Sequence, residues 1–182
     1  MMQAIDLGLS VKWADRNLGA NTPADVGDFY AWAEISPKSD YTWDNYRDKI
    51  GEGKYGPYLE SHFRSSFRRI DSSRDAMTIK HGHPWRIPTS NEFRELIDNC
   101  KWEFVCKPPT RGYRITGRNG NSIYLPAYGM PVFLLKYWSA NRCIKPQHAE
   151  ILELHNERAP ELFYRSRFYG FNIRGVYDLQ HK

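Results

Sequence analysis

The 182-residue chain has few cysteines and no long hydrophobic run, and these absences exclude several classes of protein. Its three cysteines, Cys100, Cys106 and Cys143, lack the Cys-x-x-Cys spacing of zinc and redox sites, so we expect free thiols. A Cys100–Cys106 disulfide is the alternative, and it would require an oxidising compartment. No apolar stretch approaches the ~18 residues of a transmembrane helix, so we expect no membrane insertion.

Signatures of export and of common catalytic sites are also missing. The first residues, MMQAIDLGLSVKW, contain no basic stretch followed by an apolar core, so we expect no secretory signal in this chain. The glycine-rich phosphate loop, the Gly-x-Ser-x-Gly elbow and the His-Glu-x-x-His helix do not occur. The sequence therefore predicts no cofactor and no enzymatic activity.

What the chain does have is aromatic side chains, which make up 15% of its residues. Together with a hydrophobic content of 41%, this favours a compact β-containing fold over disorder. No repeat, linker or low-complexity tract divides the sequence, so we predict a single α+β domain over residues 1–182. The net charge of +5 is moderately basic and identifies no partner by itself.

The clearest local pattern predicts a helix over residues 90–99. Thr89 is suited to the N-cap position, and Glu92, three residues later, completes a capping box. Phe93, Leu96 and Ile97 then follow at helical spacing and form an apolar stripe. We expect this helix to pack on a sheet.

Short strands are predicted in the remaining sequence from alternating or aromatic-rich runs. Thr22, Pro23 and Gly27 are typical of a short helical turn. An Asn119-Gly120 turn of type I′ is expected between two of the strands. The predicted strands are residues 4–13, 29–32, 102–105, 113–116, 122–125, 137–139, 151–155 and 168–177.

A second helix is predicted where Leu59, Phe63, Phe67 and Ile70 recur at spacings of four, four and three. The arginines beside this stripe are interpreted as a solvated helix surface, and a phosphate-binding face is the alternative. If they bound nucleic acid, affinity for any duplex would depend steeply on salt; the arginines concerned are Arg64, Arg68, Arg69 and Arg74.

Candidate chemistry is sparse. His81 and His83, two residues apart, could ligate a metal from a loop, but no third ligand of suitable spacing is apparent unless the fold brings His62 near, and a loop without metal is the preferred interpretation. Asp28 and Glu34 flank the predicted 29–32 strand and are interpreted as structural polar groups rather than a catalytic pair. Finally, a nucleophilic Cys143–His148 pair would need a third orienting group, which the sequence does not identify.

Seven segments form a recognisable series that runs in order along nearly the whole chain. They are IDLGLSVKWADRNLGA (5–20), GDFYAWAE (27–34), YTWDNY (41–46), HPWRIPTSNEFRELIDNC (83–100), NGNSIYLPAYG (119–129), YWSAN (137–141) and YGFNIRGVY (169–177). Together they resemble the Fibrobacter succinogenes major paralogous domain family, which is abundant in Bacteroidetes.

This resemblance implies a C-type-lectin-like fold of the branch that includes formylglycine-generating enzymes and variable proteins. Such a fold has two helices, a twisted and mainly antiparallel sheet, and long loops. Variable proteins display ligand-facing side chains between the last two matched segments. Carried onto this chain, the expected exposed ligand-binding residues are Ser139, Asn141, Arg142, His155, Asn156, Arg165, Arg167 and Tyr169.

The chain also departs from the family pattern. Ala33 replaces the glycine typical of the GDYYAWGE segment, and the loop between Gly129 and Tyr137 is shorter than in relatives. The paired cysteines of a formylglycine-generating site are not recognisable, which argues against that activity.

We therefore predict a non-catalytic module that recognises a protein or a glycan through the surface formed by residues 139–169. A structural or receptor-binding component of a phage or another extracellular assembly is the alternative, and a basic nucleic-acid-binding domain is the weaker one. No metal site is predicted, because oxygen ligands for Ca²⁺ do not cluster in the sequence. The location would be the cell surface if a signal was removed, or a virion.

Overall fold

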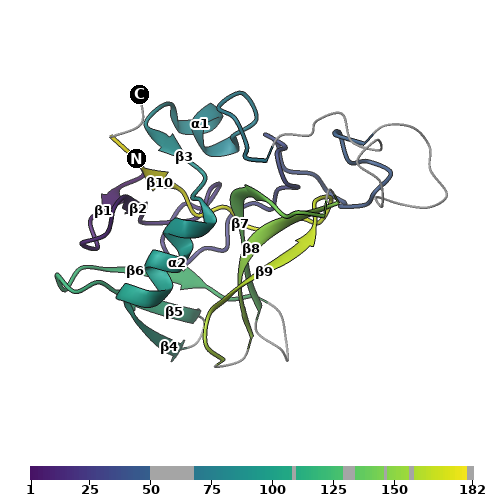
Figure 1. Ribbon diagram of the computed structural model, residues 1–182. Coiled ribbons are helices and arrows are strands. Elements are labelled where there is room, and N and C mark those ends of the chain that lie inside the picture. Colours follow the sequence, from purple (N-terminus) through teal and green to yellow (C-terminus); the bar gives the residue numbers. More distant parts are fainter. Residues whose placement is uncertain (50–67, 108–109, 129–133, 146, 156–157, 180–182) are drawn as a thin grey trace.

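A computed structural model describes residues 1–49, 68–107, 110–128, 134–145, 147–155 and 158–179. In these residues the fold is α+β, as expected, with two helices and three small antiparallel sheets (Figure 1). The helices are α1 (Ala76–His81) and α2 (Ser90–Asn99). Among the described residues, no helix has the length and apolar character needed to cross a membrane.

The first sheet joins the two ends of the chain. It contains β1 (Ala4–Ile5), β2 (Lys12–Ala14), β3 (Trp85–Arg86) and β10 (Val176–Tyr177), in the order β1-β2-β10-β3. The strand expected over residues 4–13 is therefore split. Gly8 has a φ of 75°, and this left-handed conformation lets the chain turn back so that β2 pairs with β1.

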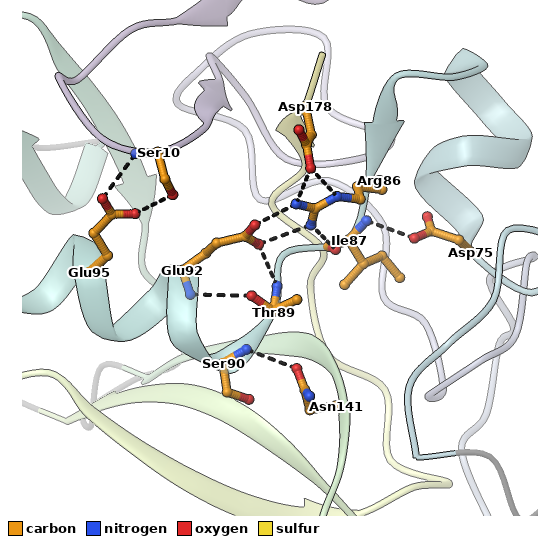
Figure 2. Close-up of polar contacts among 10 residues, drawn as sticks. All are labelled: Ser10, Asp75, Arg86, Ile87, Thr89, Ser90, Glu92, Glu95, Asn141 and Asp178. Carbon is orange, nitrogen blue, oxygen red and sulfur yellow. Dashed lines mark hydrogen bonds and ion pairs between the residues drawn. The ribbon is translucent and has the colours of Figure 1, made fainter. Parts of the chain in front are cut away.

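Helix α2 has the bounds and the cap that the sequence predicts. Thr89 and Glu92 form a reciprocal capping box, and Phe93 and Leu96 are fully buried. Side chains on three other segments anchor the helix (Figure 2). Glu95 accepts hydrogen bonds from Ser10, Glu92 pairs with Arg86, and the Ser90 N–H donates to Asn141.

Arg86 extends this anchor to the C-terminal strand. Its guanidinium pairs with Glu92 on α2 and also with Asp178, which follows β10, at 2.7 Å (Figure 2). Asp75 caps the start of α1 and accepts the Ile87 N–H at 2.8 Å. The Arg86–Glu92 ion pair thus connects α2 to the β3 region, and the Asp75–Ile87 hydrogen bond connects α1 to it.

The second sheet consists of β4 (Lys101–Lys107), β5 (Thr110–Thr116) and β6 (Ser122–Pro126), which confirms three predicted strands. The predicted turn type between β5 and β6 is wrong. A type I′ turn needs positive φ at both central residues, whereas Asn119 has negative φ and Gly120 has a φ of 85°. The Gly120 N–H donates to Gly117, which closes a three-residue loop with glycine at its left-handed position.

The third sheet, β7 (Leu134–Arg142), β8 (His148–His155) and β9 (Glu161–Ser166), contributes to both sides of the core. Tyr137 and Leu152 pack in the cluster that contains Phe93 of α2, while Trp138 and Ile151 pack in a second cluster with Trp32. Because successive side chains point to opposite faces, the middle of β7 and of β8 is covered on both faces, which explains the adjacent apolar pairs Tyr137–Trp138 and Ile151–Leu152.

Several other predictions are wrong or fall outside the described residues. Residues 29–32 form one isolated bridge, from Tyr30 to Phe171, instead of a strand, and residues 22–27 contain turns rather than a helix. The expected 168–177 strand is reduced to bridges and β10. Of the expected helix over residues 59–70, only the last three residues are described, and they are not helical. Helix α1 was not predicted.

Ala33 adopts a φ of 62°, in the left-handed region that favours glycine. This is the position at which the family that the sequence resembles typically has glycine. A left-handed backbone costs a residue with a Cβ atom roughly 1–2 kcal/mol, and glycine avoids that cost.

We expect Ala33→Gly to raise the free energy of unfolding by about 0.5–1 kcal/mol, because relief of strain exceeds the extra entropy of an unfolded glycine. Urea denaturation would measure the change. Ala24→Gly, at an exposed turn residue with negative φ, is the control and should lower stability. Equal destabilisation by both substitutions would contradict this explanation.

Candidate ligand-binding face

Strand β9 presents aromatic side chains at the edge of the third sheet. It pairs with β8, and no other strand in the described part of the chain pairs with its outer edge. Phe163 and Tyr164 are 39% and 40% exposed, which is high for large aromatic residues. Their rings are stacked with centroids 4.9 Å apart and planes inclined by 2°. The pair forms a partly exposed aromatic platform.

Cationic and polar side chains surround this platform. The Arg165 guanidinium lies 4.3 Å from the Phe163 ring centroid, and Lys145 Nζ lies 5.8 Å from that of Tyr164. The His148 ring packs edge-on against Tyr164 at 5.4 Å. We call these five residues, Lys145, His148, Phe163, Tyr164 and Arg165, the β9 face. Stacked rings and positive charge suit hydrogen-bonding ligands that also offer an apolar or acidic group.

A buried carboxylate links the β9 face to Tyr169. Glu153, 1% exposed, accepts from Arg165 at 2.8 Å and lies 3.7 Å from Lys136 Nζ. Lys136 in turn lies over the Phe171 ring, and Phe171 contacts the exposed Tyr169 at 6.0 Å between centroids. Arg165 and Tyr169 are thus two sequence-predicted site residues that a chain of contacts through Glu153, Lys136 and Phe171 connects.

Arg167 was expected to be exposed, and that expectation is wrong. Its side chain is buried, forms an ion pair with Asp48, and donates to Tyr46 Oη at 3.1 Å. The guanidinium also lies 4.7 Å from the Trp32 ring centroid. A buried guanidinium needs such partners because its desolvation is costly. Arg167 therefore supports the end of β9 from inside and does not contact solvent.

Ser139 is likewise buried instead of exposed. Its hydroxyl contacts Ser90 Oγ at 2.9 Å, and its carbonyl accepts the Trp32 indole N–H. Asn141 is half-buried, and its side chain accepts the Ser90 N–H at the start of α2. Arg142 is half-buried, and its backbone N–H donates to the Arg68 carbonyl. These β7 residues hold the core and the helix in place.

The remaining two predicted site residues are His155 and Asn156. His155 ends β8, where its backbone pairs with Leu134. Asn156 lies outside the described residues.

Sequence reasoning missed Phe163, Tyr164, Lys145 and His148 as members of the face. The run Glu161–Ser166, ELFYRS, has adjacent aromatic residues of high β-propensity, and this signal was available. What the run alone did not indicate is that β9 is an edge strand. Whether a strand lies at the edge of a sheet depends on its pairing with other strands, and β9 pairs with β8 on one side.

The other candidate groups give no catalytic or metal site in the described residues. No cluster of three or more metal-ligating side chains occurs there, and all three cysteines are free. Glu34 is buried and pairs with Lys38 at 2.9 Å, as a structural carboxylate. Arg74 pairs with Asp48, so its charge is partly compensated. Arg64, which belongs to the same predicted basic group, lies outside the described residues.

The Cys143–His148 pair does come together, through a backbone hydrogen bond from Cys143 N–H to the His148 carbonyl at 3.1 Å. A nucleophilic pair also needs a group that orients the imidazole. The buried His148 Nδ1 has no hydrogen-bond partner in the part of the chain that is described. Within the described residues, the Cys143–His148 pair therefore lacks the third group of a catalytic triad.

We expect the pKa of His148 to lie below its usual value of about 6.5, because burial and the charges of Lys145 and Arg165 disfavour the imidazolium. An NMR titration of the imidazole would measure it, and Lys145→Ala should raise it. Lys101→Ala, on another sheet, is the control. Because the unfolded chain binds this proton more readily, acidification through about pH 6.5 should reduce stability. A pKa of His148 above 6.5 would contradict this description.

Comparisons with known proteins assign no family to this chain. No family model, no curated protein and no solved structure matches it. The resemblance to the Fibrobacter succinogenes major paralogous domain family therefore stays a prediction that rests on the sequence motifs.

Proposed function

We propose that this protein is a non-catalytic recognition module with a C-type-lectin-like fold, which binds a protein or glycan ligand through the β9 face and Tyr169. The observation that carries the proposal is the exposed Phe163–Tyr164 stack, bordered by cations and supported by a buried ion pair. Tyrosine, phenylalanine and arginine are the side chains that dominate binding energy at protein interfaces.

The support beneath this surface favours recognition because it fixes the aromatic platform before a ligand arrives. Arg167 and Glu153 are both buried and paired directly behind β9. A preorganised surface loses less conformational entropy on binding, so more of the contact energy appears as affinity. Exposed aromatic groups on an otherwise well-packed body are also characteristic of interaction sites.

Two observations favour the C-type-lectin-like branch of the proposal. The described residues have two helices, antiparallel strands and long irregular connections, which are compatible with that fold, although the strands form three small sheets instead of one. In addition, Ala33 has a left-handed backbone at the position where the resembled family typically has glycine. A backbone conformation of this kind is a property of the fold and not of the local sequence, so it favours a shared architecture.

The test is binding to glycan and protein arrays by the wild-type protein and by Phe163→Ala and Tyr164→Ala variants. Each substitution should weaken a specific hit by about tenfold or more, because each removes half of the stacked platform. The matched control is Ile79→Ala, since Ile79 is 50% exposed on α1, away from β9.

We expect the control to bind within about twofold of the wild type. Near-ultraviolet circular dichroism would verify that all three variants keep their tertiary packing. An array hit that survives both aromatic substitutions unchanged would contradict the proposed site. Conversion of a bound glycan or peptide into products would contradict the non-catalytic role.

A further inference from the structure

A cavity lies beside the β4–β5–β6 sheet, away from the residues of the β9 face. One face of that sheet packs in the core through Tyr113, Ile115 and Leu125. The alternate side chains point to the other face, where Ile5 of β1 and the turn at Pro23 stand over them. The cavity is open to solvent on one side, and its volume of about 570 Å³ is within the range of small-molecule sites.

The walls of this cavity are mainly apolar. Ile5, Pro23 and Val105 line it, and the ring of Tyr124 contributes a flat surface. The tip of that ring approaches Gly112, since a Cβ atom there would be 2.8 Å from Tyr124 Cζ. The same Cβ atom would be 2.2 Å from the Leu125 carbonyl oxygen, so glycine is required at this position. An apolar slot with an aromatic wall suits a flat hydrophobic group.

Arg114 is the charged group in the cavity that remains available to a ligand. It is exposed, and it forms no ion pair or side-chain hydrogen bond among the described residues. Its cross-strand neighbour Glu103 is paired instead with Lys101 at 3.1 Å. The other charged lining residue, Asp15, is already occupied by hydrogen bonds from Gln3 N–H and Arg16.

A buried guanidinium makes the same region more positive. Arg174 is fully buried behind the cavity and donates to the carbonyls of Ala14 and Tyr124, at 3.0 and 2.7 Å. Its Nε has no hydrogen-bond partner in the described structure. Burial alone would raise the pKa of Asp15, but hydrogen bonds from Arg16 and Gln3 and the nearby guanidinium charges hold it below its usual value. Asp15 in the cavity and Glu103 beside Arg114 are thus already engaged by Arg16 and Lys101, which leaves the Arg114 guanidinium for an anion.

We propose that this cavity binds a small molecule with a flat apolar body and a single carboxylate, which forms an ion pair with Arg114. The aromatic body lies against Tyr124 between Ile5 and Val105. The ligand enters from the solvent side, where Arg114 and Ser122 are exposed. This site is separate from the β9 face and does not depend on the function proposed for it.

The test uses naphthalene-2-carboxylate and its neutral analogue naphthalene-2-carboxamide, titrated into the full protein and followed by ¹H–¹⁵N NMR. We expect the carboxylate to bind at least about tenfold more tightly, because a charge-assisted hydrogen bond is roughly twice as strong as a neutral one. The shifted resonances should belong to β1, β4, β5 and β6 residues around the cavity.

Arg114→Gln should reduce the affinity for the carboxylate to that for the carboxamide and leave the carboxamide unaffected. The control, Arg118→Gln, removes an exposed arginine from the turn of the same sheet and should bind both compounds like the wild type. Ser122→Phe, which fills the cavity mouth from an exposed position, should abolish both interactions.

Equal affinity for the two compounds, or an equal loss in the Arg114 and Arg118 variants, would overturn the proposal. So would the absence of any shift, or shifts confined to β9. Loss of array binding at the β9 face would not affect this result, so failures of the two proposals are distinguishable.

Discussion

The ion pair between Arg167 and Asp48 is the constraint on which the position of the proposed binding face depends. Both side chains are buried, and an unpaired charge in either place would be strongly destabilising. Asp48 also pairs with Arg74, and Arg167 stacks on Trp32, so one buried cluster joins segments far apart in the sequence. Strand β9 ends directly before Arg167. Its aromatic residues are therefore displayed from an edge strand whose end is fixed from inside.

The third sheet supplies the rest of that rigidity. Strand β8 is covered on both faces, by a cluster around Phe93 and by one around Trp138, and it carries β9 as its neighbour. Helix α2 is held against the same sheet by the contact between Ser90 and Asn141 (Figure 2). Contacts that lie far from the β9 face therefore fix its geometry, because the position of an edge strand depends on the position of the strand with which it pairs.

Capping and turn residues predicted the elements that short-range interactions stabilise. The 90–99 helix followed from its capping box, and Asn119-Gly120 indicated where the β5–β6 hairpin turns, although not the type of turn. The site was less predictable because exposure is a non-local property. Ser139 and Arg167 have polar side chains that are typical of a surface, yet Trp32 and Asp48, more than 100 residues away in each case, cover them. The stacked pair on β9 became recognisable only once β9 was known to be an edge strand.

The most direct test of the central claim is hydrogen–deuterium exchange of the protein with and without the ligand that the arrays identify. Our account predicts slower exchange in residues 158–169 and in the β8 residues that pair with them, and unchanged exchange in α2. Protection that appears on α2 or on the first sheet, with residues 158–169 unaffected, would contradict it.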